Sequence, residues 1–305
     1  MPTRPPAGAA TVVAPPNRDT LAVTAVLLAL LTALTYGLAN YLGPLLTRTS
    51  PLAGVLLVGQ VASLAGAAVL LLLRGGPVPD GHSLVLGLLA GMANGVALAS
   101  LYAASAVVPL SVLSPIGATG SAVPVLVALA LGERPGPLQL VGIPVAVVGV
   151  VLAAARPGSE HDTEEVARRR PAGLGLAVLS AVGFGTFLTL FAEASKGGQA
   201  WAVLSSRACL LACTVLVVLV ARPAVRVPLR TVPLLAVPGL LLLAGTASYG
   251  AASSLGLVSV VSVLASLSPV VTVGLAVLLL SERLARAQRV GVALALAGVV
   301  LLAAG

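Results

Sequence analysis

The sequence predicts an all-α membrane protein with ten transmembrane helices in two inverted five-helix repeats. Two observations lead to this fold class: long apolar runs that carry almost no charge, and an internal repeat. Hydrophobic residues make up 58% of the 305 residues and charged residues 9%, against about 45–50% and about 25% in soluble domains. A water-soluble fold of this length would leave much of that apolar surface exposed.

Ten apolar runs are long enough to be considered as membrane spans. A helix of about 20 residues crosses the hydrocarbon core and satisfies its own backbone hydrogen bonds, which lipid cannot do. The expected spans are 20–46, 52–73, 83–106, 110–131, 137–155, 172–192, 199–221, 231–253, 257–280 and 288–304.

The remaining segments are short. Residues 1–19 contain five prolines and are expected to be a disordered tail, and residues 156–171 are expected to be a charged linker. The first apolar run is longer than the hydrophobic part of a signal peptide, so we expect it to remain as the first span. Residues 20–155 and 172–304 then form the two repeats.

The repeat becomes visible when Glu133 is placed on Glu282, an offset of 149 residues. Fourteen of the 29 positions from 126 to 154 are then identical in the second half, including Glu133, Arg134, Gln139, Gly142 and Gly149. Five spans in each half are an odd number, so the second half would enter the membrane from the opposite side. Inverted repeats in transporters hold the substrate near the membrane midplane between the halves.

Three segments resemble the EamA branch of the drug/metabolite transporter superfamily, and the resemblance covers residues 20–304. The segments are Tyr-Gly-Leu-Ala-Asn at 36–40, a stretch ending in Gly-Glu-Arg at 124–134, and one containing Ser-Pro and Ser-Glu-Arg at 268–284. This resemblance implies ten helices in two inverted halves and the transport, often outward, of amino acids, nucleotide precursors, sugars or other metabolites. The pattern departs from the family in two ways, because Pro124 lies nearer to its glutamate than Pro269 does, and Tyr36 replaces the usual tryptophan.

Arg207 is the one strong base deep inside an expected span, about eight residues into the seventh. Its planar guanidinium could bind a carboxylate or phosphate of a substrate. The alternative is that its long side chain extends to the lipid headgroups.

Other polar side chains within spans are candidates for substrate contact because such groups are costly in lipid. Each of them could instead form a hydrogen bond between helices. The candidate substrate-binding residues, with Arg207, are Tyr36, Asn40, Gln60, Asn94, Tyr102 and Tyr249.

Three prolines and two Glu-Arg pairs have other expected roles. Pro115, Pro124 and Pro269 interrupt apolar helices and are candidate helix breaks or gates. For the pairs Glu133-Arg134 and Glu282-Arg283 we expect a structural role, with each carboxylate bound to its neighbouring arginine or to backbone amides that open the next helix.

Several functional classes lack the residues that they need. Cys209 and Cys213 lie four apart on one helix, a spacing that suits small packing residues better than a disulfide. No motif indicates a metal, a cofactor or an enzyme. The net charge of +8 lies in loops without an aromatic-rich basic domain, so lipid headgroups are expected rather than nucleic acid.

The sequence therefore predicts a multi-pass protein of the inner (plasma) membrane. Its expected function is secondary transport, with export of small polar metabolites such as amino acids by alternating access. Coupling to an ion or proton is left open, as is the oligomeric state. The alternative is a membrane scaffold or receptor that keeps the fold without transport. The loop arginines favour termini outside, whereas the resemblance implies cytoplasmic termini.

Overall fold

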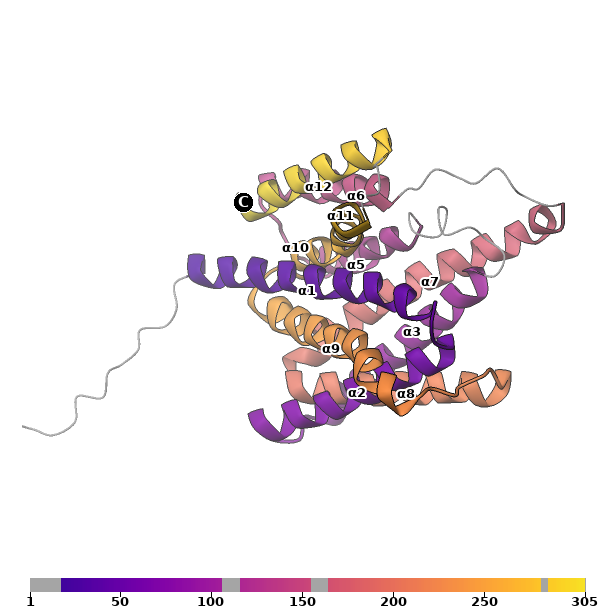
Figure 1. Ribbon diagram of the computed structural model, residues 1–305. Coiled ribbons are helices and arrows are strands. Elements are labelled where there is room, and N and C mark those ends of the chain that lie inside the picture. Colours follow the sequence, from indigo (N-terminus) through magenta and orange to yellow (C-terminus); the bar gives the residue numbers. More distant parts are fainter. Residues whose placement is uncertain (1–17, 106–115, 155–163, 281–284, 305) are drawn as a thin grey trace, which may run out of the picture.

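The structure is a computed structural model that describes residues 18–105, 116–154, 164–280 and 285–304. The described residues form helices without strands (Figure 1). The long helices are α1 (Arg18–Leu46), α2 (Leu52–Arg74), α3 (Gly81–Ser105), α6 (Pro137–Ala154), α7 (Glu164–Lys196), α8 (Gln199–Ala221), α9 (Val232–Leu255) and α12 (Arg286–Ala304). The short helices are η1 (Thr119–Ser121), α5 (Ala122–Ala130), η2 (Leu229–Thr231), α10 (Val258–Ala265) and α11 (Ser268–Leu280).

Within the described ranges, eight segments are long and apolar enough to cross a membrane. They include α10 and α11 taken together as Val258–Leu279. The expected fourth and fifth spans appear as shorter apolar helices, Ile116–Ala130 and Pro137–Ala153. Eight spans establish a multi-pass membrane protein, and the complete ten-span arrangement stays a prediction.

The outer surface of the helices is apolar, as contact with lipid requires. Large aliphatic side chains such as Leu72, Leu131 and Leu219 are exposed, whereas the buried core contains many alanines, serines and threonines. Small residues at helix contacts let backbones approach closely, which is how membrane helices gain packing energy when lipid is as apolar as leucine. This distribution is the reverse of that in a soluble bundle.

Helices α6 and α12 pack closely against each other (Figure 1). A Cβ on Gly149 would overlap the backbone of Ala295, and a Cβ on Gly298 would lie 2.5 Å from the Cβ of Ala146. The repeat offset of 149 places Gly149 on Gly298 and Ala146 on Ala295. The two contacts are therefore the same contact with the halves exchanged. The same exchange relates the contacts of Gly142 with Leu302 and of Gly291 with Ala153, so the two helices run antiparallel.

Other helix contacts exchange in the same way. In the two repeats, α1, α2 and α3 correspond to α7, α8 and α9. Helix α3 packs on α7, and the corresponding helix α9 packs on α1. Helix α3 also contacts α8, and the corresponding helix α9 contacts α2. An antiparallel, exchangeable set of contacts is what an inverted twofold relation between halves requires.

The repeated glutamines have a structural role in both halves. Gln139 accepts a hydrogen bond from the N–H of Gly136 at 3.0 Å, and Gln288 accepts one from Ala285 at 3.1 Å. Each glutamine is the third residue of its helix and reaches back to the residue before it, which is half of a capping box. The conservation of Gln between the two halves therefore reflects the start of α6 and α12.

Two segments differ from the expected organisation. Helix α7 begins at Glu164, inside the expected linker. The expected ninth span is divided at Ser266 and Leu267 into α10 and α11. The tail and the first part of the linker lie outside the described residues.

Candidate functional site

Thr246 of α9 is the centre of a buried polar cluster. Its hydroxyl lies 2.9 Å from the hydroxyl of Tyr36 on α1 and accepts a hydrogen bond from Nη2 of Arg207 on α8. Thr246 in turn donates to Leu242 O at 2.8 Å. Gly245 makes room for this cluster, because a Cβ there would lie 2.5 Å from the ring of Tyr36. Three helices from both halves thus meet at one hydroxyl.

Arg207 is buried, with 3% of its surface exposed. Besides Thr246, its Nη2 donates to Leu242 O at 2.8 Å, and its Nε has no hydrogen-bond partner. The alternative in which Arg207 extends to the headgroups is therefore wrong. No carboxylate among the described residues forms an ion pair with it. A buried guanidinium without a counter-charge is costly, and its free N–H can receive an anion.

Helix α2 adds two more buried polar side chains. Gln60 and Ser63 are 5% and 0% exposed, and neither Gln60 Oε1 nor Ser63 Oγ has a hydrogen-bond partner. Helix α2 packs against both α8 and α9, and Gly59 meets Gly239 at the contact with α9. Unpaired buried polar atoms cost free energy unless a ligand or water completes them.

A row of aromatic rings connects Tyr36 with Tyr249. The row passes through Phe184, Phe187 and Phe191 of α7, with ring centroids 5.6–6.4 Å apart. The hydroxyl of Tyr249 lies 2.8 Å from Ser262 Oγ of α10. Tyr249 is therefore bound to α10, one turn of α9 away from Thr246, and belongs to the packing around the cluster.

One face of α8 carries Arg207 between two hydrophobic blocks. Val203 precedes it by four residues and is 0% exposed, and Leu210 follows it by three and is 2% exposed. Gln199 begins the same face and Thr214 continues it. Residues three and four apart stack along a helix, so this face runs from one end of the molecule past Arg207 to the other.

Gln199 closes one end of this face. Its Oε1 accepts a hydrogen bond from Arg74 at the end of α2 at 3.2 Å, and its Nε2 donates to Ala247 O of α9. The end of α2 and the second half of α9 are thereby tied to the start of α8. We refer to Arg74, Gln199 and Ala247 as the Gln199 bridge.

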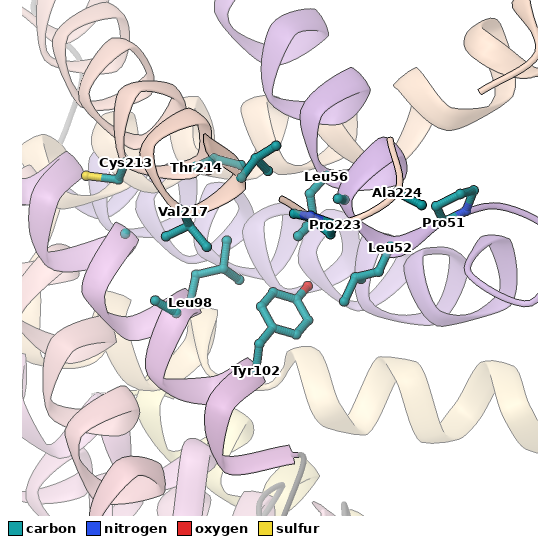
Figure 2. A pocket seen from close by; sticks show the side chains of 14 residues that line it. Pro51, Leu52, Leu56, Leu98, Tyr102, Cys213, Thr214, Val217, Pro223 and Ala224 are labelled. Carbon is teal, nitrogen blue, oxygen red and sulfur yellow. The ribbon is translucent and has the colours of Figure 1, made fainter. Parts of the chain in front are cut away.

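A cavity of about 350 Å³ occupies the opposite end, between α2, α3 and α8 (Figure 2). Tyr102 points its hydroxyl into this cavity toward the start of α2. Thr214 lines it two turns along α8 from Arg207, and Leu210 lies between the two. Arg207 itself does not line it. The full lining is Pro51, Leu52, Ala53, Leu56, Gly95, Leu98, Ala99, Tyr102, Cys213, Thr214, Val217, Val218, Pro223 and Ala224.

The two cysteines pack against glycines of α3. Cβ positions on Gly91 and Gly95 would lie 2.8 and 2.7 Å from the Cβ atoms of Cys209 and Cys213. Both thiols are free. They act as small packing residues, as expected, and Cys213 also borders the cavity.

Glu133 joins the two halves at the start of α10. Its carboxylate accepts hydrogen bonds from the N–H of Val258 at 2.7 Å and from the N–H and hydroxyl of Ser259 at 3.1 and 2.7 Å. Gly132, with φ of 94°, ends α5 and turns the chain so that Glu133 faces α10. The expected binding to backbone amides is thus observed, although the helix belongs to the other half and is not the next one.

A second cavity, of about 590 Å³, lies beside this contact. It is lined by the start of α1, the end of α9, α10 and α12, and includes Gln139 and Ser254. None of the expected substrate-binding residues lines it.

The remaining expected residues lie in different surroundings. Asn40 is exposed although Tyr36, one turn away, is buried, and Asn94 is half-buried outside both cavities. Pro269 lies in the first turn of α11, where the missing N–H costs nothing, and Pro124 lies three residues after the 3-10 turn η1 within the apolar helix Ile116–Ala130. Ser266 donates to Val263 O at 2.7 Å at the break before α11. Pro115, Glu282 and Arg283 lie outside the described residues, and Arg134 follows Glu133.

Two central residues were not expected from the sequence. Thr246 is one of many short polar residues in apolar runs, and Gln199 stands at the first position of its helix. Neither pattern indicates which helices their side chains join.

Comparison with known proteins identifies the second half. The sequence profile of the EamA-like transporter family matches residues 171–304. This half of the chain belongs to the EamA-like transporter family, within the drug/metabolite transporter superfamily. Members of this family are membrane transporters rather than enzymes. No match was found among curated proteins.

A solved structure has a fold similar to that of nearly the whole chain. It is described only as the crystal structure of a protein and superimposes with a TM-score of 0.70. The two sequences are 20% identical over 93% of this chain and 95% of that chain. At this identity the likeness concerns the fold alone, and it includes the half that the family profile does not match.

Proposed function

We propose that the chain is a secondary transporter that moves small metabolites by alternating access past Arg207. The supporting observation is a buried arginine that pairs with no carboxylate of the described residues and lies between Val203 and Leu210 on one face of α8. A charge is kept in a membrane interior when it serves a function. The guanidinium plane suits a carboxylate or phosphate, so a substrate anion would supply the missing counter-charge.

The two ends of α8 differ in a way that supports this mechanism. The Gln199 bridge ties α2, α8 and α9 together at one end, whereas a cavity separates α2, α3 and α8 at the other. In the proposed cycle, the cavity admits substrate and Leu210 moves aside. Substrate then reaches Arg207, the cavity closes, and the Gln199 bridge and Val203 separate. Exchangeable contacts between the halves would let the two ends swap roles at little cost in free energy.

The resemblance guides the remaining parts of the proposal. On this basis we extend the proposal to small polar metabolites such as amino acids, to outward movement and to the inner (plasma) membrane. A pH gradient across the liposome membrane tests coupling to protons. The buried aromatic row would keep α1, α7 and α9 together while the ends of the helices move.

Transport assays test this proposal directly. Purified protein in liposomes preloaded with single metabolites should exchange at least one of them for its labelled form. Arg207→Gln should lower the initial rate at least tenfold, because Gln offers no charge to the anion. Arg230→Gln changes an exposed arginine of η2 and should leave the rate unchanged. Folded wild-type protein that exchanges no member of a broad panel would favour the scaffold or receptor alternative.

A further inference from the structure

The cavity between α2, α3 and α8 has a composition that restricts its ligand. Apolar side chains such as Leu52, Leu56, Leu98 and Val217 form most of its wall, and Tyr102 and Thr214 supply the hydroxyls. Its volume of about 350 Å³ is at the lower end for small-molecule sites. A strongly polar solute would lose water there without gaining enough hydrogen bonds. The cavity therefore suits a small apolar group, such as a phenyl ring or a short alkyl chain.

The chain segments that border this cavity are basic. Arg222 directly precedes the lining residue Pro223, and Arg48 lies three residues before the lining residue Pro51. Both arginines are exposed. The connecting segments 47–51 and 222–231 contain four arginines and no acidic residue. The positive charge would attract an anion and oppose a cation.

The backbone at Arg222 is held in an unusual conformation. Its φ of 46° is left-handed, and its N–H donates to Val218 O at 2.8 Å, which ends α8. A residue other than glycine in this conformation is strained and needs support from its surroundings. Arg222 is thus fixed at the point where α8 ends and the bordering segment begins.

Neither the cavity lining nor the α8 face offers a carboxylate as counter-charge for an ammonium group. None of the fourteen lining residues is acidic. The residues of the α8 face from Gln199 to Thr214 are also without carboxylates. A zwitterionic amino acid would therefore bring a positive group past Arg222 and Arg207 without a counter-charge. An anion that lacks this group would not meet the same cost.

We propose that the cavity binds organic monoanions that have an apolar body and no ammonium group, such as arylalkyl carboxylates. The apolar body lies between Leu52, Leu98 and Val217, and the carboxylate faces Arg222 at the border of the cavity. This inference rests on the proposed transport function only for its claim that the bound anion is cargo. It changes the expected substrate class from amino acids to carboxylates of comparable size.

Equilibrium binding to purified protein in nanodiscs tests the ligand class. The probes are 3-phenylpropanoate, phenylalanine and 2-phenylethylammonium, which share a phenyl ring and differ in charge. We expect 3-phenylpropanoate to bind at least tenfold more tightly than either of the others, and more weakly as salt is raised. No saturable binding of 3-phenylpropanoate, or equal binding of phenylalanine, would overturn the proposal.

Variants test the location of binding. Leu98→Trp and, as a smaller change, Ala99→Leu fill the cavity and should each weaken 3-phenylpropanoate binding at least tenfold. Val96→Trp places the same tryptophan side chain at an exposed position of α3 and should have no effect. Arg222→Gln should weaken binding about threefold to tenfold. Unchanged binding in folded Leu98→Trp or Ala99→Leu would show that the anion binds elsewhere, and would overturn the proposal.

The binding and flux assays fail independently. Binding that follows the expected series without flux of the probe would contradict transport and leave the binding site in place. Flux of a zwitterionic amino acid that Leu98→Trp does not change would overturn the ligand class and leave transport in place.

Discussion

Thr246 supports two buried side chains with one hydroxyl, although it is among the smallest residues of the site. It bonds both Tyr36 and Arg207 and is 0% exposed. Removing this oxygen leaves a guanidinium N–H with only a carbonyl partner, whereas removing the Tyr36 hydroxyl leaves the arginine contacts intact. The charged group makes the first change the more damaging one.

Thr246→Val should therefore destabilise the protein more than Tyr36→Phe does. Loss of a neutral hydrogen bond costs about 1 kcal/mol, and leaving a charged donor short of a partner costs up to about 3 kcal/mol. The measurement is the midpoint of thermal unfolding in a single detergent. If Tyr36→Phe lowers the midpoint as far as Thr246→Val does, Thr246 is not the centre of the cluster.

Asp80 gives a pH-dependent effect at the start of α3. Hydrogen bonds from the side chain and backbone N–H of Ser83 lower the pKa of this exposed carboxyl below its ordinary value of 3.8. A lowered folded-state pKa contributes stability that is complete above pH 3.8 and is lost as the pH falls through the folded-state pKa. The hydrogen bonds from Ser83 should therefore make wild type more stable to thermal unfolding than Asp80→Ala at pH 6.

The check is a pair of thermal unfolding series for wild type and Asp80→Ala between pH 6 and pH 3. The difference between their midpoints should be largest at pH 6 and shrink below pH 3.8. A difference that grows with acidity would contradict the assigned hydrogen bonds.

At the scale of helices, the α6–α12 crossing depends on glycines that the repeat places in equivalent positions. Gly149→Ala should push the helices apart, because the added carbon meets backbone atoms of Ala295. Overpacking of this kind costs about 1–3 kcal/mol. Gly175→Ala in α7 is the matched control, since no atom lies within 4 Å of the added carbon. It should be neutral or stabilise by up to about 1 kcal/mol.

Thermal unfolding and the protein's retention on a sizing column measure both effects. Gly298→Ala should reproduce the loss seen for Gly149→Ala, because the repeat offset relates the two positions. Unequal losses would mean that the crossing is not shared evenly by the two halves.

Glu133 links α5 to α10 through backbone amides. Glu133→Ala should expose the N–H groups of Val258 and Ser259 and cost about 1 kcal/mol, a typical value for a helix cap. Glu133→Gln keeps one acceptor oxygen and should lie between wild type and Ala. Hydrogen exchange of the Val258 and Ser259 amides is the readout. Equal exchange in all three proteins would contradict the capping role.

Much of this element-level structure is predictable from the sequence. Hydropathy locates the long helices, and the offset of 149 finds Gln139 and Gln288, whose short-range caps depend only on local spacing. The break at Ser266 and the early start of α7 are not predictable in this way. Hydropathy averaged over a window of residues hardly changes at a turn of two residues, and it does not detect a helical segment that is charged.

The candidate site is only partly predictable for a related reason. Arg207 and Tyr36 stand out because charged and phenolic groups are rare in lipid, and the structure brings them together. Asn40 is also a polar residue in an apolar run, but it is exposed. Its spacing from Tyr36 predicts the helix face on which it lies, but not whether another helix packs over it. Thr246 and Gln199 act through contacts between distant helices, which one sequence does not encode in a readable pattern.

For the molecule as a whole, the difference between its two ends is the main feature. The Gln199 bridge holds one end together, and a cavity opens the other, while Arg207 lies buried between Val203 and Leu210. If these ends alternate, weakening the bridge should favour the state in which the cavity is closed. Gln199→Ala removes both bridge contacts without touching the cavity lining.

The most direct test is the rate of thiol modification at both ends of α8. In a Cys209→Ala background, Cys213 reports on the cavity, and Val203→Cys in a Cys213→Ala version reports on the bridged end. Adding Gln199→Ala should slow modification at Cys213 and speed modification at position 203, each at least threefold. Alternating access around Arg207 would be contradicted if both rates rose together, or if neither changed.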